Sequence, residues 1–281
     1  MIQNETNAND SIPRLAMINS FAGFGRCSTT IALPVISAMQ IQVCPIPTAI
    51  LSNHLAFSTC HYNDYTPYMR SYIQVWKELG FTFDGLYCGF MGNMEQIAIA
   101  EEFVTHFKPS MFLLDPVMGD NGKMYSAITE EYCEKLKSLL PLATILTPNI
   151  TEACLLTNTP YKKGRWTDYE LQILCDKLAS LCPGHIVITG LNHNSSFMNY
   201  IWQNGIRSTY TVPAAGSLRH GTGDLFASIL AADALHQVDL QASVRKAADF
   251  VALCLRGSDK IATPTIEGVA FEKYLHYLIC E

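Results

Sequence analysis

The stretch GLYCGFMGNMEQIAIAEEFVTHFKPSMFLLDPV, residues 85–117, contains the pattern that decides the fold. Its first six residues, Gly85–Phe90, are typical of a strand, and Met94–Phe107 carries apolar residues at helical spacing. A second apolar run, Met111–Val117, has the length and composition of a buried strand. A strand, a helix and a second strand at this spacing predict a βαβ unit with two parallel strands.

The same alternation continues on both sides of this unit. Further strands are predicted at Leu15–Asn19, Val43–Leu51, Thr144–Thr147 and Ile186–Thr189. Further helices are predicted at Thr29–Met39, Pro67–Leu79, Glu130–Leu140 and Leu171–Leu181, with Pro34 as a kink or a late first-turn residue of the first. The repeated pattern predicts an α/β fold with a mostly parallel sheet.

The last third of the chain departs from this alternation. The runs Phe197–Trp202 and Ile206–Val212 are joined by Asn204-Gly205, which is the signal of a hairpin with a type I′ turn. The sheet is therefore expected to carry antiparallel strands late in the chain. Helices are predicted beyond the hairpin at Thr222–Leu235, Leu240–Arg256 and Glu267–Ile279.

Length and composition limit the class of protein. A chain of 281 residues that is 49% hydrophobic and 16% charged can bury a large core. We find no linker or repeat, and predict a polar tail at residues 1–12 and one domain at 13–281. The net charge of −6 without a basic stripe argues against nucleic-acid binding. Apolar runs such as Ile31–Met39 are too short to span a membrane.

Ten cysteines raise the question of disulfides or zinc. No two of them have the C-x₂-C spacing, and most lie within apolar segments. Buried free thiols in a reducing cytoplasm are the expected state.

The turn His220-Gly221-Thr222-Gly223-Asp224 precedes a run of good helix formers. Glycines permit a tight turn, and the free N–H groups and dipole of the helix N-terminus attract anions. An acid beside an anion suits the activation of a hydroxyl for attack on a phosphate. The alternative interpretation is a plain helix start with a favourable first-turn acid.

Polar residues also follow several of the other predicted strands, and ligands of open α/β sheets bind at the carboxyl ends of strands. These residues are Asn19, Ser20, Ser52, Asn53, His54, Asp115, Asp120, Thr147, Asn149, Glu152 and Thr189. Their convergence on one edge of the sheet predicts a binding site there.

Two common nucleotide motifs do not account for this site. The chain has no G-x-x-x-x-G-K-[ST] sequence and therefore no P-loop. Gly23–Ser28 begins like a dinucleotide fingerprint, but Ser28 stands where the last glycine belongs. We interpret this segment as a flexible loop near a substrate.

Five segments together resemble the pyridoxal kinases of the ribokinase-like superfamily, over about residues 14–280. They are INSFAGFG (18–25), SNH (52–54), DPVMGDNGKMY (115–125), TPNITEA (147–153) and GTGD (221–224). The resemblance implies a three-layer α/β/α sandwich and ATP-dependent phosphorylation of the 5′-hydroxymethyl group of pyridoxal, pyridoxine or pyridoxamine.

The resemblance also implies roles for individual residues. Asp224 would accept the hydroxyl proton, and the N–H groups of Gly221, Thr222 and Gly223 would hold the transferred phosphoryl group. The substrate-side positions are Ser20, His54, Leu55 and Phe90. The nucleotide-side positions are Asp115, Asp120, Tyr125, Thr147, Asn149, Glu152 and Thr189.

Cofactors and assembly follow from the same resemblance. Asp115 and Glu152 would act around Mg²⁺ through waters, because Mg²⁺ keeps much of its hydration shell. A monovalent cation such as K⁺ is compatible with the family. The expected state is a cytoplasmic homodimer that binds small molecules, with no nucleic-acid or membrane partner. The segment His61–Tyr68 is expected to be a lid by its position.

Each candidate residue also has a structural interpretation. Ser20 and Thr189 could simply end strands, His54 could be a buried histidine with internal partners, and Asp115 could be a turn residue beside Pro116. Asn149 could cap a helix after Pro148, with Glu152 completing a capping box.

Two positions depart from the family pattern. A threonine often stands at Leu55, and an aromatic hydroxyl often stands at Phe90. Both changes make the ring pocket more apolar, so the preferred vitamer stays open. A kinase for the hydroxymethylpyrimidine of thiamin synthesis and a non-catalytic B6-binding protein remain alternatives.

Overall fold

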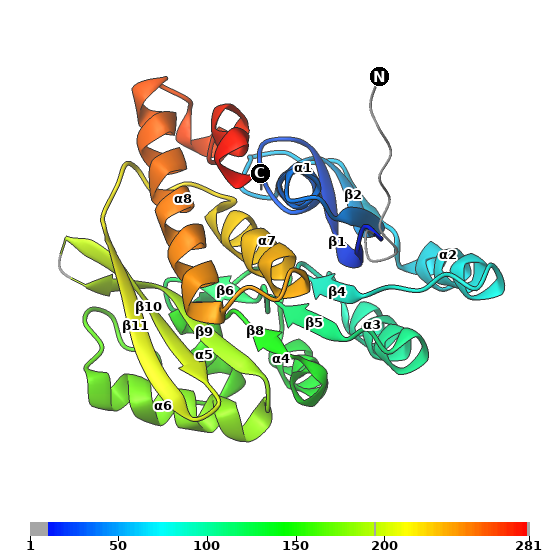
Figure 1. Cartoon of the computed structure of the whole chain (residues 1–281), viewed down its shortest axis with the longest axis horizontal. Coiled ribbons are helices and arrows are strands. Elements are labelled where there is room, and N and C mark those ends of the chain that lie inside the picture. The colour runs from blue at the N-terminus through cyan, green and yellow to red at the C-terminus, as the bar shows by residue number, and fades with distance from the viewer. Residues whose placement is uncertain (1–10, 194, 280–281) are drawn as a thin grey trace.

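The computed structural model describes residues 11–193 and 195–279, and its centre is a nine-stranded sheet (Figure 1). The strand order is β11-β10-β9-β8-β5-β4-β1-β2-β3. The strands are β1 (Arg14–Phe24), β2 (Gln42–Asn53), β3 (Tyr62–Asp64), β4 (Gly85–Cys88), β5 (Met111–Leu114), β8 (Ile145–Leu146), β9 (His185–His193), β10 (Ser196–Gln203) and β11 (Ile206–Pro213).

Most neighbouring strands of this sheet are parallel. The run from β9 through β8, β5, β4 and β1 to β2 is parallel, whereas β10, β11 and β3 are antiparallel to their neighbours. Asn204 and Gly205 have φ values of 52° and 81°, as a type I′ turn requires at both positions. The predicted parallel sheet with a late antiparallel hairpin is confirmed.

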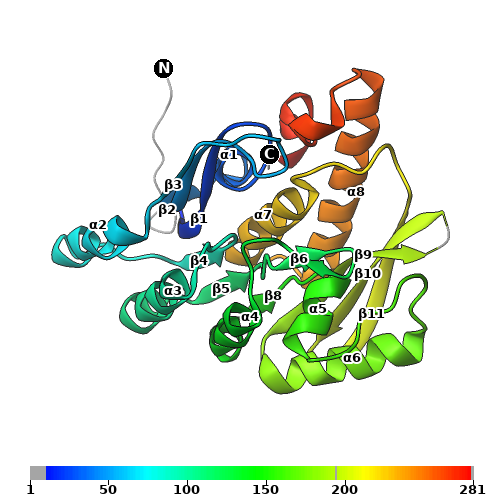
Figure 2. The same cartoon turned by 180° about the vertical axis from the view of Figure 1, so that it is seen from behind.

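Helices cover both faces of the sheet, as the opposite views in Figures 1 and 2 show. On one face, α1 (Thr29–Ala38), α7 (Thr222–Leu235) and α8 (Leu240–Lys260) bury apolar residues against the strands. The helices of the other face are α2 (Thr66–Glu78), α3 (Met94–Phe107), α4 (Glu130–Leu136), α5 (Ile150–Leu156) and α6 (Asp168–Leu181). The molecule is therefore a three-layer α/β/α sandwich.

Strands β1 and β2 extend beyond their parallel neighbours. Residues Leu15–Ile18 pair with β4, but Phe21–Phe24 pair only with β2. A register shift between Asn19 and Phe21 marks the point where the pair leaves the main sheet. Strand β3 adds to the far side of β2, so a small projecting sheet lies beside the carboxyl edge.

Some elements differ from the sequence-based expectation. The predicted helix at Glu267–Ile279 is wrong, because this segment contains the 3₁₀ turns η2 (Thr265–Glu267) and η3 (Glu272–Leu278), separated by Gly268 at φ 83°. Strand β5 ends at Leu114 rather than Val117, since Pro116 has no N–H for a ladder.

Four short elements were not predicted. They are β3, α5 and the two strands of a hairpin, β6 (Gly119–Asp120) and β7 (Lys123–Met124). The 3₁₀ helix η1 (Lys137–Leu142) continues the predicted helix from α4. Pro34 lies inside α1. Of the predicted tail at 1–12, residues 1–10 lie outside the described residues.

The described part of the chain contains nine cysteines. All nine are free thiols, and six of them are buried. No helix within residues 11–193 and 195–279 combines the length and apolarity that a membrane span requires.

Candidate active site

Most of the predicted site residues lie at the carboxyl edge of the parallel strands. Asn19 and Ser20 are at the point where β1 leaves the main sheet, Asp115 follows β5, and Thr147 follows β8. Asp224 lies in the first turn of α7, and its negative charge raises the pKa of Asp115. The fold thus brings residues from four distant segments together.

The turn before α7 has the geometry expected of an anion site. Gly221 has φ 86°, and a Cβ there would lie 2.5 Å from the Arg26 carbonyl oxygen, so only glycine fits. No side chain caps the helix, and a Cβ on Gly223 would meet no atom within 4 Å. The first N–H groups of α7 are therefore free to bind a ligand.

Asp224 lies in the first turn of α7, and burial raises the pKa of its carboxyl to about 6. The Ser28 backbone N–H and the Asn19 amide act in the opposite direction and limit this rise. Because Ser28 is the N-cap of α1, the carboxylate also lies at the N-terminal end of a second helix dipole. Asp224 is therefore ionised at neutral pH and can accept a proton.

Asp115 and Glu152 form a buried acidic pair next to Asp224. Asp115 is 8% exposed, and burial together with the charge of Asp224 raises its pKa to about 8, against a hydrogen bond from Thr147. Burial and the charge of Asp115 raise the pKa of Glu152. The Glu152 carboxylate accepts hydrogen bonds from the N–H groups of Met118 (3.2 Å) and Asn149 (2.8 Å).

This pair has no cationic partner among the hydrogen bonds and ion pairs of the described residues. A cation held near it would relieve the burial of the two charges. Within the described residues, however, no three His, Cys, Asp or Glu side chains converge to hold a metal ion alone. The donor set therefore fits a hydrated cation that accompanies another ligand, and the Mg²⁺ assignment stays a prediction.

Asn149 caps α5, which confirms the structural interpretation of this residue. Its Oδ1 accepts hydrogen bonds from the N–H groups of Thr151 (2.8 Å) and Glu152 (3.0 Å), and Glu152 completes the capping box. Its Nδ2 donates to the Gly119 carbonyl (2.9 Å). Asn149 also forms an isolated parallel bridge with Thr189. Contact of Asn149 or Thr189 with a nucleotide stays a prediction.

The β6–β7 hairpin presents two more of the predicted nucleotide residues to solvent. Asp120 is exposed, and its carboxylate accepts hydrogen bonds from the backbone (2.7 Å) and side chain (2.9 Å) of Asn121. Tyr125 is 46% exposed, and burial of its hydroxyl end together with nearby carboxylates raises its pKa. Tyr125 directly follows β7, and the charges of Glu152, Asp120 and Asp115 all act on its hydroxyl.

Ser20 and Phe90, which are expected on the ring side of the site, are both held by internal hydrogen bonds. The Ser20 side chain is 5% exposed, and its hydroxyl donates to Ser28 Oγ at 3.0 Å. The Phe90 carbonyl accepts a hydrogen bond from Thr48 Oγ1 (2.9 Å), and the Phe90 N–H donates to Asn19 Oδ1 (3.0 Å). The Phe90 backbone is therefore held from both sides.

His54 has internal partners for both ring nitrogens. Its Nε2 lies 2.7 Å from the Ile266 carbonyl, and its Nδ1 accepts from the Ala56 N–H at 3.3 Å, which requires the Nε2–H tautomer. His54 is 7% exposed, whereas Leu55 is 53% exposed. The His54 ring also packs against Phe57 (4.7 Å between centroids) and His220 (4.9 Å), so its assignment as a substrate residue stays a prediction.

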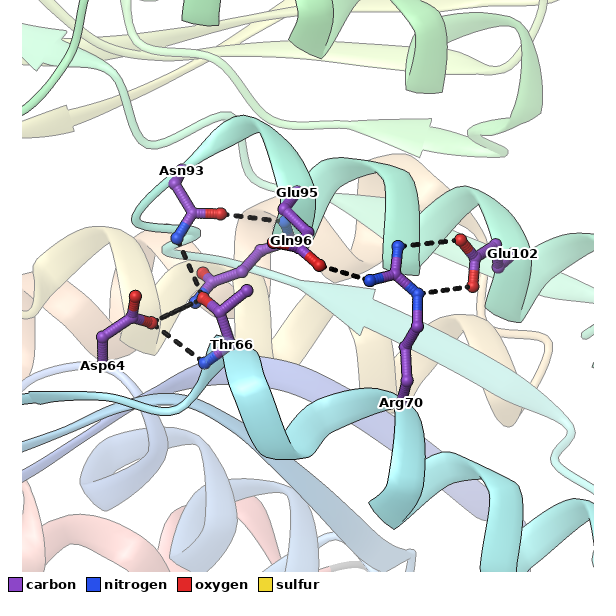
Figure 3. A network of polar contacts seen from close by, with 7 residues as sticks. All are labelled: Asp64, Thr66, Arg70, Asn93, Glu95, Gln96 and Glu102. Carbon is purple, nitrogen blue, oxygen red and sulfur yellow. Dashed lines mark hydrogen bonds and ion pairs between the residues drawn. The ribbon is translucent and has the colours of Figure 1, made fainter.

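The expected lid at His61–Tyr68 is held at Asp64 and Thr66 by a polar network with α3 (Figure 3). It contains β3 and the start of α2. Gln96, which is fully buried on α3, donates through Nε2 to Thr66 Oγ1 (2.7 Å), Asp64 Oδ1 (3.2 Å) and the Thr48 carbonyl (2.8 Å). Nearby, Arg70 pairs with Glu95 and Glu102. Lid motion of this segment stays a prediction.

Sequence reasoning missed two residues that contact the candidate base. Ser28 takes φ 50°, a conformation that is uncommon for serine, and directs its N–H at Asp224. Asn19 was predicted to lie at this binding edge, but its action on Asp224 was not predicted. The one available signal was the serine in place of a glycine in the Gly23–Ser28 segment.

The sequence matches the model of the phosphomethylpyrimidine kinase family over residues 35–267. It is 25% identical to the pyridoxal kinase of Dictyostelium discoideum, over 86% of this chain and 82% of that protein. It is also 25% identical to the hydroxymethylpyrimidine/phosphomethylpyrimidine kinase of Aquifex aeolicus, over 88% and 90% of the two chains.

One solved structure resembles the chain in both fold and sequence. It is a candidate phosphomethylpyrimidine kinase of Bacteroides thetaiotaomicron in a crystal form with pyridoxal. It is 31% identical, superposes with a TM-score of 0.91, and the match covers 96% of each chain.

Proposed function

Because the chain belongs to the phosphomethylpyrimidine kinase family, we propose that it is an ATP-dependent kinase of the B6 vitamers. It transfers a phosphoryl group to the 5′-hydroxymethyl group of pyridoxal, pyridoxine or pyridoxamine. The observation that carries the choice of substrate is the pyridoxal bound by the Bacteroides thetaiotaomicron protein, which matches this chain along almost its whole length.

In the proposed reaction the Asp224 carboxylate accepts the proton of the substrate hydroxyl. The hydroxyl oxygen forms a bond to the γ-phosphorus of ATP, and the bond from that phosphorus to the bridging oxygen of ADP breaks. The N–H groups of Gly221, Thr222 and Gly223 bind the oxygens of the transferred group as charge develops on them. The products are the 5′-phosphate and ADP, and the proton is on Asp224.

The buried acidic pair has a place in this proposal. Asp115 and Glu152 would hold the hydrated Mg²⁺ that accompanies ATP, and this cation would neutralise phosphate charge. The raised pKa values of both carboxyls record the cost of burying them without a cation. Asp120 and Tyr125 lie on the exposed hairpin where the nucleotide would enter.

A second candidate is a kinase for hydroxymethylpyrimidine. The observations that favour it are the family match and the Aquifex aeolicus relative, which spans 88% of this chain. The same base and anion site would serve a hydroxymethyl group on either ring. The two rings differ in the hydrogen bonds they offer at their edges, so contacts around Ser20 and Phe90 would distinguish them.

Product analysis tests the proposal. The chain is incubated with MgATP and, separately, with each of the three vitamers and hydroxymethylpyrimidine, and the products are identified by mass spectrometry and ³¹P NMR. We expect a monophosphate ester on the 5′-oxygen of at least one vitamer. Phosphorylation of the pyrimidine alone would establish the second candidate instead.

We further propose that the chain is a cytoplasmic homodimer. The projecting part of β1 and β2 exposes Phe21 (42%), Phe24 (54%) and Ile50 (42%), and Phe21 is paired in register with Ile50. Adjacent exposed apolar side chains are typical of interaction surfaces. Light scattering coupled to size exclusion should give twice the chain mass, and Phe21→Ser should give the monomer.

A further inference from the structure

The Asn19 side chain is buried at the centre of the site, and one end of its amide has no partner. Asn19 is 1% exposed, and its Oδ1 accepts hydrogen bonds from the N–H groups of Ser20 (2.9 Å) and Phe90 (3.0 Å). Its Nδ2 has no partner at ordinary hydrogen-bond geometry among the described residues, and Asp224 is the acidic group on which this amide acts. Buried amide groups normally have partners at both ends, so the free end indicates a function.

The orientation of this amide is determined by its surroundings. Two backbone N–H groups converge on one atom, which must therefore be the oxygen, and the nitrogen must occupy the other position. A Cβ at position 89 would lie 2.5 Å from Nδ2, so Gly89 leaves the space that the nitrogen needs. The amide is thus held rigidly, with Nδ2 in a fixed place.

The neighbouring group on which this amide acts is the Asp224 carboxyl, because the Asn19 side chain lowers the pKa of Asp224. Asn19 lies where β1 leaves the main sheet, and Asp224 lies in the first turn of α7. Hydrogen bonds of catalytic groups are often long in unliganded proteins and shorten when the substrate binds. An amide fixed by two backbone groups can direct a carboxylate without titrating itself.

We propose that Asn19 is a positioning residue that donates through Nδ2 to one oxygen of Asp224 and turns the other oxygen toward the acceptor hydroxyl. The proposal rests on the proposed function, in which Asp224 is the base. The same side chain is joined through Oδ1 to Ser20 and Phe90, so it also sets the distance between the ring pocket and the base.

The variant Asn19→Asp tests this role directly. It keeps an oxygen to accept from Ser20 and Phe90, but replaces the donor that faces Asp224 with an acceptor. We expect kcat to fall about 100-fold, as for other small misplacements of catalytic groups. The KM values for ATP and for the vitamer, and the binding of ADP, should stay close to those of the wild type.

A matched control is Gln96→Glu, the same amide-to-acid change at another buried position. Gln96 donates to three partners within a structural network that contains none of the proposed catalytic groups (Figure 3). This variant should lower the melting temperature and leave kcat within a few-fold. Asn19→Asp should instead lower kcat about 100-fold, whatever its effect on the melting temperature.

Wild-type kcat in Asn19→Asp would overturn the proposal and leave Asn19 as an anchor of the backbone only. If Asn19→Asp does not fold, Asn19→Ala is measured instead. A folded Asn19→Ala protein with wild-type kcat would also overturn the proposal. A loss of kcat at unchanged KM would support the proposal. The wild-type assay separates the two levels of inference. A wild type that phosphorylates no acceptor refutes the proposed function, whereas an active wild type with an equally active Asn19→Asp refutes only the role of Asn19.

Discussion

Asp224→Asn should inactivate the protein and stabilise it at the same time. The structure holds the pKa of this carboxyl at about 6, compared with an ordinary value of 3.8. A difference of one pKa unit corresponds to about 1.36 kcal/mol, so ionised Asp224 costs the unliganded fold at most about 3 kcal/mol at pH 8. The neutral amide keeps an oxygen that can accept from the Ser28 N–H, so the variant avoids this cost.

The sign of the effect with pH follows from the raised pKa. The folded chain binds the Asp224 proton more tightly than the unfolded chain, so wild-type stability falls as the pH rises from about 4 to 6. The advantage of Asp224→Asn should therefore be small near pH 4 and grow up to pH 6. It should keep growing toward pH 8, because burial together with the charge of Asp224 raises the pKa of Asp115 to about 8 in the wild type. Loss of the base should lower kcat by 10²–10⁴-fold above pH 6, where Asp224 is ionised in the wild type.

Urea unfolding of the two unliganded proteins at pH 4.5, 6 and 8, together with steady-state kinetics, measures both effects. Unfolding gives the free-energy difference at each pH, and the kinetics give kcat and KM. A variant that is less stable than the wild type at pH 8, or a difference that does not change with pH, would refute the account of a buried and uncompensated carboxylate. Full activity in the variant would show that Asp224 is not the base.

Three further predictions follow from the same site. Gly221→Ala should destabilise the fold by at least about 1–2 kcal/mol, because alanine at φ 86° is strained and its Cβ meets the Arg26 carbonyl. The control Gly223→Ala has open space and a helical backbone, so it should be as stable as the wild type or slightly more stable. Urea unfolding measures both differences. In the wild type, kcat/KM for the acceptor should fall about tenfold per pH unit below pH 6 as Asp224 becomes protonated, and a rate that stays flat to pH 5 would contradict this assignment. Phe90→Tyr should change the ratio of kcat/KM values among the three vitamers by more than about threefold, because it adds a hydrogen-bonding group at the ring side. The KM for ATP should not change. The same vitamer ratios in the variant and the wild type would place Phe90 outside the pocket.

The sheet could be predicted from the sequence because its signals are local. The βαβ unit at residues 85–117 and the Asn204-Gly205 turn are each determined by periodicity and turn chemistry within a short segment. The predicted C-terminal helix was wrong because a local signal was overridden by the backbone conformation. Apolar spacing at Glu267–Ile279 is close to helical, but Gly268 adopts φ 83° and the segment forms 3₁₀ turns instead.

The candidate site could be predicted only in part. The residues of GTGD and Asp115 can be recognised in the sequence because they belong to short motifs, and the fold brings them together. The contact of Asn19 with Phe90 joins positions 71 residues apart, and nothing in either segment indicates it. The capping role of Asn149, in contrast, could be predicted, because the cap and the Glu152 that completes the capping box lie within four residues.

The central claim is that a hydroxymethyl group on a B6 ring is the acceptor, and the ratio of specificity constants tests it most directly. ADP release is measured in a coupled assay with pyridoxal, pyridoxine, pyridoxamine and hydroxymethylpyrimidine under the same MgATP concentration. The account predicts that kcat/KM is highest for one of the three B6 vitamers. A kcat/KM that is higher for hydroxymethylpyrimidine than for every vitamer would contradict it.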